Sequence, residues 1–373
     1  MKQETSTVLL GLNLQELTRM VEESGQPSYR AQQLFHALYA DRVSSTEQVS
    51  TLPKEFRSTL ANEGIEVGFP KIQSKFVSMD GTARYLIDLS DGETVETVWM
   101  PEGDDGEAGD GTEAGAEVVA GGPRSWNRAT ICVSSQVGCA VNCQFCLTAL
   151  LGIKRNLTAG EIVGQVLAVL RDHNVSPPGD RVNLVFMGMG EPFLNFDNFI
   201  KAVRLLAEGV GIPEPRMTVS TAGIVPRIYD LGAESVRPKL AISLNAPNDE
   251  LRTELMPITK KWNLETLMLA AREFPLRPRE KLTFEYVLLK EVNDTPEHAR
   301  ELTGLIHGIR AKVNLLALNP GPGIQFAMPG EQNVRAFQQI LNASGTPAFI
   351  RRPRGRDIYA ACGQLKRTVE IST

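Results

Sequence analysis

The chain lacks the features of an exported or membrane-spanning protein. It contains no apolar run of about 18 residues, roughly the shortest run that predicts a membrane-spanning helix. Its N-terminus has neither a basic region nor the apolar stretch of an export signal. The five cysteines are an odd number and cannot all pair as disulfides. We therefore expect a cytoplasmic protein with reduced cysteines and no membrane association.

The chain also lacks an excess of basic residues, and its acidic residues are unevenly distributed. The formal net charge of the 373 residues is −5. Residues 101–123 hold seven acidic residues and no basic one, and they are rich in Gly and Ala without an aromatic residue. A segment of this composition cannot bury a core, so we predict a disordered surface insertion over about residues 102–123. The rest of the chain is mildly basic, and its arginines are densest at Arg351, Arg352, Arg354 and Arg356.

The first third of the chain predicts a small appendage to a larger domain. Apolar residues recur at helical spacing within residues 8–65, which predicts a helical module over 1–68. Residues 70–100 change to strand character, with Asp80-Gly81 and Asp91-Gly92 as hairpin turns. We expect a β-hairpin linker over 69–127 that includes the acidic insertion.

Strands and helices alternate from about residue 128 onward, and we treat 128–373 as the core domain. Helices are predicted at 158–173 and 195–208, and Thr158-Ala-Gly-Glu161 matches a capping box. Six βα units imply a parallel sheet with right-handed crossovers, whose functional groups gather at the carboxyl ends of the strands. The candidate strands are 129–135, 182–187, 216–221, 239–245, 281–289 and 313–318.

Three cysteines lie close together at Cys139, Cys143 and Cys146, with the spacing C-x3-C-x2-C. Their thiolates can ligate three irons of a cubane iron–sulfur cluster and leave the fourth iron open. Structural zinc is the alternative, but zinc needs a fourth Cys or His nearby. The nearest downstream histidine, His173, lies in a predicted helix outside zinc spacing. The spacing, after a strand and before a helix, resembles the radical S-adenosylmethionine (SAM) superfamily. This resemblance implies one [4Fe-4S] cluster with three Cys ligands and SAM on the open iron.

Longer segments resemble the RlmN/Cfr family of RNA adenine methyltransferases. The resemblance runs from the N-terminal helices to about residue 366. It implies an α/β fold, a partial (β/α)6 radical-SAM barrel with a small N-terminal helical module and a β-hairpin extension. The segments that carry it are residues 132–139, 156–166, 187–192, 246–250 and 360–365.

The resemblance also implies a set of SAM contacts at the ends of the predicted strands. Gly188-Met-Gly190-Glu191 matches the segment that binds the methionyl amino group, since glycine allows close backbone approach and a carboxylate pairs with an ammonium group. A Rossmann fingerprint is the alternative, but residue 193 is Phe where a third glycine is needed. At one of these positions the family has His where this chain has Asn245, which forms hydrogen bonds but carries no charge. The implied contacts are Gly190, Glu191, Ser220, Ser243, Leu244, Asn245 and Asn319.

Cys132 and Cys362 would each be expected in a hydrophobic core if taken alone, because free cysteine behaves as a small hydrophobe. The family resemblance instead implies a catalytic pair. Cys362 would accept a methyl group from one SAM as a thiolate, and a second SAM would supply the radical that activates this methyl group. Cys132 would then attack the Cys362 sulfur, release the product and leave a disulfide. Glu96 matches the proposed proton acceptor of the family.

The implied substrate is C2 of a specific adenosine in 23S rRNA, at the peptidyl transferase centre, and of the adenosine next to the anticodon in tRNAs. The base must be flipped out, because stacking shields C2. The arginines at 351–356 lie near Cys362 and are predicted to contact phosphates. We expect a monomer that receives electrons from a donor such as flavodoxin or ferredoxin. A C8 methyltransferase of the Cfr type and a non-catalytic RNA-binding protein with a zinc or iron–sulfur site are the alternatives.

Overall fold

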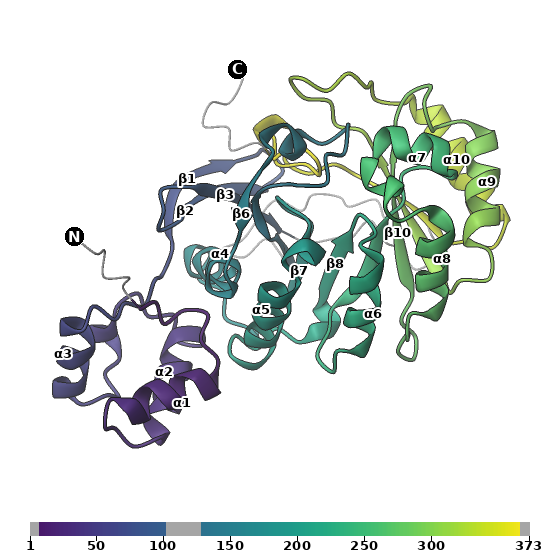
Figure 1. Cartoon of the computed structure of the whole chain (residues 1–373). Helices are drawn as coiled ribbons and strands as arrows, with labels where there is room; N and C mark the ends of the chain where they lie inside the picture. The colour runs from purple at the N-terminus through teal and green to yellow at the C-terminus, as the bar shows by residue number, and fades with distance from the viewer. Residues whose placement is uncertain (1–6, 102–127, 366–373) are drawn as a thin grey trace.

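The computed structural model describes residues 7–101 and 128–365 (Figure 1). Within these residues, one ten-stranded sheet has the order β1-β2-β3-β4-β7-β8-β9-β10-β11-β12, and β5 pairs separately with β6. The predicted insertion at 102–123 lies outside the described residues. The strands are β1 Lys71–Val77, β2 Ala83–Asp88, β3 Thr94–Pro101, β4 Ala129–Cys132, β5 Gln136–Gly138, β6 Ile153–Asn156, β7 Val182–Phe186, β8 Met217–Thr221, β9 Lys239–Ser243, β10 Leu282–Leu288, β11 Ala311–Ala317 and β12 Ala348–Arg351.

The part of the sheet from β4 to β12 is parallel throughout. This arrangement confirms the predicted α/β fold, and each of the six predicted strands is present. Strand β12 was not predicted, because its four residues lead into an Arg-Pro-Gly-rich stretch that resembles a loop. The short hairpin of β5 and β6, which brackets the cysteine motif, was also not predicted.

Helices cover the outer face of the sheet (Figure 1). The predicted capping box at the start of α4 is present, with Thr158 and Glu161 each accepting a backbone N–H of the other residue. Beyond the N-terminal module, the helices are α4 Ala159–Asp172, α5 Phe196–Glu208, α6 Val225–Ala233, α7 Asp249–Leu255, α8 Leu264–Glu273, α9 Pro296–Ile306 and α10 Glu331–Ala343.

The N-terminal module contains α1 Leu14–Glu23, α2 Tyr29–Tyr39 and α3 Lys54–Asn62 around buried residues such as Leu17 and Leu34. It shares the hydrophobic core of the barrel and is also attached by polar contacts. Lys201 of α5 pairs with Glu16 at 2.7 Å, and the Arg42 guanidinium donates to the Val175 carbonyl at 2.7 Å. A cavity of about 280 Å³ at this junction contains none of the predicted site residues.

The antiparallel strands β1 to β3 extend the sheet, because β3 pairs antiparallel with β4. Side chains alternate between the two faces of a strand. Thr97 hydrogen-bonds Gln165 of α4 at 2.6 Å, and Trp99 stacks on His173 at 4.0 Å, so these two side chains face the helices. Glu96 and the residues in register with it therefore face the interior of the barrel.

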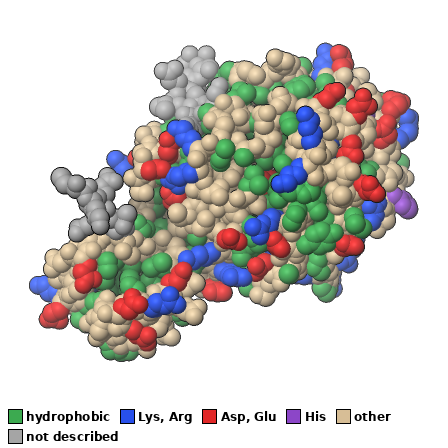
Figure 2. Space-filling model, in the orientation of Figure 1, with side chains coloured by type: hydrophobic (Ala, Val, Ile, Leu, Met, Phe, Trp, Pro, Cys, Tyr) green, Lys and Arg blue, Asp and Glu red, His purple; other side chains and the backbone are tan. Residues whose placement is uncertain are grey.

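The surface carries charges of both signs. Figure 2 shows acidic and basic side chains interspersed over the face that it presents. In the part of the chain that the structure describes, no helix is long and apolar enough to cross a bilayer.

Candidate active site

A cavity of about 180 Å³ opens at the carboxyl ends of the parallel strands. Parallel strands all end at the same edge, which gathers the residues that follow them. Most of the predicted site residues line this cavity although they lie far apart in sequence. They are Cys139, Cys143, Cys146, Gly190, Glu191, Ser220, Ser243, Asn245, Asn319 and Cys362.

The cysteine loop is held to two other segments of the barrel. The Cys139 N–H donates to the Gly152 carbonyl at 2.9 Å, and the Gln144 N–H donates to the Leu255 carbonyl at 3.0 Å. Val141 and Phe145 of the same loop pack in a hydrophobic cluster. All three thiols thereby reach one cavity with an apolar lining.

The chemistry of these thiols fits the ligands of an iron–sulfur cluster. Burial raises the pKa of Cys139 to about 12 and that of Cys143 well above its ordinary value. Ligation by iron would therefore be needed to keep them deprotonated.

Glu191 is buried beside these cysteines with a fixed orientation. Its carboxylate accepts the backbone N–H of Ala222 at 2.7 Å and that of Phe193 at 3.0 Å. Burial raises its pKa to about 7 despite these hydrogen bonds. Gly190 has φ +98° and lies against Gln136, which a Cβ would approach to 2.5 Å. The glycine therefore permits the close approach that brings Glu191 into the cavity.

The remaining polar residues of the cavity offer groups to a ligand. The Ser220 and Ser243 hydroxyls lie 3.1 Å apart. The Asn319 Oδ1 atom is buried and accepts no hydrogen bond from the described residues, so it fits a donor on a bound ligand. Leu244 differs from the other predicted contacts, since its side chain is fully buried in the main core and does not line the cavity.

Asn245, which the resemblance aligned with a His, has a backbone conformation that suits either residue. Its φ is +60°, a left-handed conformation in which Asn and His are both enriched. Its side-chain oxygen accepts the Val287 N–H at 2.8 Å, and its amide lies 3.2 Å from the Met256 sulfur. Asn245 therefore also ties the end of β9 to β10.

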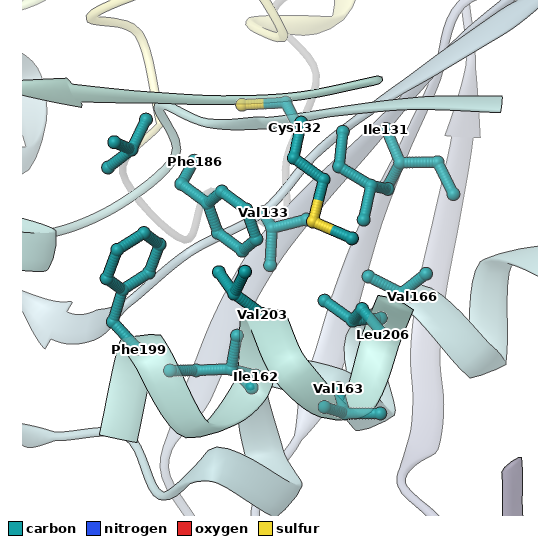
Figure 3. Close-up of a cluster of buried hydrophobic side chains, with 14 of the residues drawn as sticks. Ile131, Cys132, Val133, Ile162, Val163, Val166, Phe186, Phe199, Val203 and Leu206 are labelled. Carbon is teal, nitrogen blue, oxygen red and sulfur yellow. The ribbon is translucent and has the colours of Figure 1, made fainter. Parts of the chain in front are cut away.

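Cys362 and Cys132 lie far apart in the sequence. Cys362 is exposed on the cavity, and Cys132 is buried at the end of β4. Burial raises the pKa of Cys132 above its ordinary value, and the negative charge of a Cys362 thiolate raises it further. Figure 3 shows Cys132 above the helix-facing cluster that contains Ile131 and Val133.

Glu96 lies on the same face of the sheet as Cys132. Val98 is in register with Cys132, and Glu96 is two residues before Val98 on the same face. Glu96 is fully buried and forms an ion pair with Arg84, so it is not the exposed strand residue that its alternating position alone would suggest. Glu96 does not line the cavity with Cys362.

Sequence reasoning missed Glu285, which also lines the cavity. It lies in β10 in register with Asn314 of β11, whose side-chain amide donates to it at 2.8 Å. The available signal was a single carboxylate inside an otherwise apolar predicted strand. Burying a charge costs free energy, so such a residue is expected where the carboxylate has a partner or a function.

Comparisons with known proteins agree with this arrangement. The family model described as the radical SAM superfamily matches residues 133–303, and the ribosomal RNA large subunit methyltransferase N-terminal domain matches residues 7–65. A probable dual-specificity RNA methyltransferase RlmN from Koribacter versatilis is 66% identical over 93% of this chain and 98% of its own length. A dual-specificity RNA methyltransferase RlmN from Syntrophobacter fumaroxidans is 45% identical over 94% of this chain and 96% of its own.

A solved structure agrees as well. A radical SAM methyltransferase from Sphaerobacter thermophilus has a TM-score of 0.85 and 39% identity, and the match covers 97% of this chain and 100% of that one. A radical SAM domain implies a [4Fe-4S] cluster and SAM, which the cysteine loop and Glu191 are suited to hold. The extent of identity identifies an enzyme, and the chain belongs to the RlmN family of radical SAM methyltransferases.

Proposed function

We propose that this enzyme methylates C2 of a specific adenosine in 23S rRNA, and of the adenosine next to the anticodon in tRNAs, with Cys362 as the methyl carrier. The main observation in favour is that Cys362 and the three motif cysteines line one cavity. A charge on Cys362 also raises the pKa of Cys132, so the two thiols interact electrostatically. The relatives are named dual-specificity RNA methyltransferases, which supports RNA as the partner.

The chemistry of the target explains why two kinds of cysteine are needed. The C2 atom lies between two ring nitrogens, is electron-poor and cannot attack the methyl group of SAM directly. The cluster and SAM, when bound, supply the one-electron chemistry that this carbon requires. Three cysteines, Cys139, Cys143 and Cys146, would hold the cluster, and the Glu191 carboxylate would pair with the ammonium group of SAM. Ser220, Ser243, Asn245 and Asn319 would hold the rest of SAM, with Gly190 and the Leu244 backbone beside them.

Cys362 would act first as a thiolate that takes a methyl group from one SAM molecule. A second SAM molecule would supply the radical chemistry, so each turnover would use two. With SAM bound, the S-methyl carbon would lose one hydrogen atom and bond to C2, and the adduct would give its C2 proton to Glu96 and one electron to the bound cofactor. The Cys132 thiolate would then attack the Cys362 sulfur. The sulfur–carbon bond breaks, the released carbon takes up a proton and becomes the methyl group of the product, and the two cysteines are left as a disulfide. An electron donor such as flavodoxin or ferredoxin would supply the electrons that return the enzyme to its reduced state. We propose a monomer.

Nucleoside analysis tests the position of methylation. The reconstituted enzyme would be incubated with unmodified 23S rRNA and tRNA, and the digested products would be analysed by mass spectrometry. We expect 2-methyladenosine. Finding 8-methyladenosine would favour the Cfr-type reaction, and finding no methylated adenosine with a colourless, zinc-containing protein would favour a binding protein.

Substitution of the two outer cysteines tests their roles. Cys132→Ala keeps the carrier but lacks the resolving thiol, so it should purify with RNA bound covalently through Cys362. Cys362→Ala should carry no adduct. Ribonuclease treatment and peptide mass spectrometry would locate the nucleotide on the peptide that contains residues 360–365. Normal turnover by Cys132→Ala, or an adduct in Cys362→Ala, would show that the roles are assigned wrongly.

A further inference from the structure

Two turns that are distant in sequence are joined by a reciprocal pair of aspartates. One turn connects β1 to β2 at residues 78–82, and the other is the turn at 355–359 that precedes Cys362. The Asp80 carboxylate accepts the Gly355 N–H at 3.0 Å. The Asp357 carboxylate accepts the Ser78 hydroxyl at 2.6 Å and the Met79 N–H at 3.4 Å. Each turn therefore supplies a carboxylate to the other.

Asp80 serves both turns at once. One of its oxygens accepts the Thr82 N–H at 2.9 Å, which closes the hairpin turn, and the other accepts Gly355. Burial raises the pKa of Asp80, but hydrogen bonds from Gly355, Thr82 and Ser78 outweigh burial and hold the pKa below its ordinary value. The ionised carboxylate therefore makes charge-assisted hydrogen bonds, which are stronger than neutral ones.

The turn before Cys362 is compact and packs closely against the β1–β2 turn. Gly355 has φ +59°, and a Cβ on it would lie 2.7 Å from the Ala360 side chain and 2.9 Å from that of Thr82. Tyr359 also has a left-handed φ of 54°. Such a conformation costs a non-glycine residue roughly 1 kcal/mol or more, so surrounding contacts must hold it.

The other side of Cys362 is anchored separately. The Leu147 N–H donates to the Gly363 carbonyl at 2.8 Å, and the Thr148 hydroxyl donates to the Leu365 carbonyl at 2.7 Å. Leu147 and Thr148 directly follow Cys146, the last cysteine of the motif. Cys362 therefore lies between an anchor on the hairpin and an anchor on the cysteine loop.

We propose that Asp80 and Asp357 are positioning residues that hold the Cys362 segment at the cavity through the β1–β2 turn. The inference rests on the proposed role of Cys362 as methyl carrier. The Cys362 sulfur has to meet SAM, the adenine and Cys132 in succession, and an unanchored segment would present it in productive positions for less of the time. The hairpin extension then serves the reaction although it contributes no lining residue to the cavity.

The test compares Asp80→Ala and Asp357→Ala with Asp91→Ala. Asp91 begins the other Asp-Gly hairpin turn and caps it in the same way, accepting the Glu93 N–H at 3.1 Å. Among the described residues, Asp91 forms no hydrogen bond or ion pair with residues 355–365, and its other bond goes to Arg155. It is therefore a control for the general effect of weakening an Asp-Gly turn.

Two readouts of the cluster-free full-length chain report on the segment directly. Amide hydrogen exchange over residues 355–365 should become about tenfold faster in Asp80→Ala and Asp357→Ala, as the loss of charged hydrogen bonds predicts. The rate at which iodoacetamide alkylates Cys362, followed by peptide mass spectrometry, should also change. In the reconstituted enzyme, kcat for RNA methylation should fall about tenfold with little change in KM for RNA. Asp91→Ala should leave all of these near the wild-type values.

Unchanged exchange over 355–365 in both variants, or an equal change in Asp91→Ala, would overturn the proposal. Ser78→Ala removes one hydroxyl donor to Asp357 and gives a milder second test if either aspartate variant fails to fold. An inactive wild-type enzyme would refute the proposed function instead, and the exchange measurement would still decide whether the aspartates hold the segment.

Discussion

At the scale of single residues, Arg252 supports several parts of the candidate site. Its guanidinium is fully buried and donates to the carbonyls of Ala222, Ser243 and Leu244, at distances from 2.7 to 3.1 Å. These carbonyls follow or end β8 and β9, and the Ala222 N–H in turn holds Glu191. Burial lowers the pKa of Arg252 to about 10, which leaves it charged at neutral pH.

Arg252→Met should destabilise the cluster-free chain by about 3 kcal/mol, because it leaves buried carbonyl groups without their charged donor. Arg252→Lys should recover only part of this loss, since an ammonium group lacks the planar fork of donors. Denaturant unfolding would measure both. Arg227→Met removes an exposed pair with Asp230 and should cost less than about 1 kcal/mol. Equal losses at positions 252 and 227 would contradict this account.

His173 should make the stability of the protein sensitive to acid. Burial lowers its pKa to about 4, with a smaller contribution from Lys75, whereas an unfolded histidine titrates near 6.5. Between these two pKa values the unfolded chain binds more protons than the folded one. The contribution of His173 to the free energy of unfolding is therefore present above about pH 6.5 and is lost as pH falls toward 4. When the pH is lowered across this range, the free energy of unfolding should fall by roughly 1–2 kcal/mol less in His173→Gln than in the wild type.

Unfolding experiments at pH 7 and pH 4.5 would measure this difference. His36→Gln is the control, because the His36 side chain is 70% exposed. The same acid sensitivity in wild type and His173→Gln would rule out His173 as its source.

At the scale of elements, two glycines let the N-terminal segment lie directly on the start of α4. A Cβ on Gly160 would lie 2.1 Å from the Leu10 carbonyl oxygen. A Cβ on Gly11, whose φ is +103°, would lie 2.6 Å from the Gly160 nitrogen. Backbone atoms cannot move aside as a flexible side chain can, so this contact depends on the absence of side chains.

The same substitution should have opposite effects in two helices. Gly160→Ala should lower the free energy of unfolding by about 2 kcal/mol, because it overpacks the contact with Leu10. Gly304→Ala in α9 should raise it by about 0.5–1 kcal/mol, since a Cβ there meets nothing within 4 Å and alanine favours a helix. Thermal and denaturant unfolding would measure both changes. Stabilisation by Gly160→Ala would show that the N-terminal segment is not packed tightly on α4.

At the scale of the whole molecule, net charge opposes the binding of RNA. Deleting residues 103–121 removes six acidic residues and no basic one from a chain of net charge −5. We expect the deletion to tighten RNA binding at low salt, by up to roughly tenfold, because it removes repulsion of phosphates. Binding measured across a salt series should show the advantage shrinking as salt screens it. Weaker binding by the deletion variant, or loss of soluble expression, would contradict a purely electrostatic role.

The local features of this protein could be predicted from its sequence. Hydrophobic periodicity located the N-terminal helices and the six strands, because the helix and strand repeats are fixed by backbone geometry. The Asp-Gly pairs located both hairpin turns, and Gly81 and Gly92 do adopt positive φ. The cysteine spacing located the candidate cluster loop, since its residues are close in the chain whatever the fold.

Contacts between residues distant in sequence could not be predicted, because they depend on how the strands and loops pack in three dimensions. The segment that contains Cys362 is held between contacts that involve Asp80 and Thr148, and neither contact follows from local pattern. Strand pairing also decided which side chains face inward, so that Glu96 is buried in the barrel and Leu244 points into the core. Register and side-chain direction depend on long-range pairing, and a shift of one residue would reverse every face of a strand.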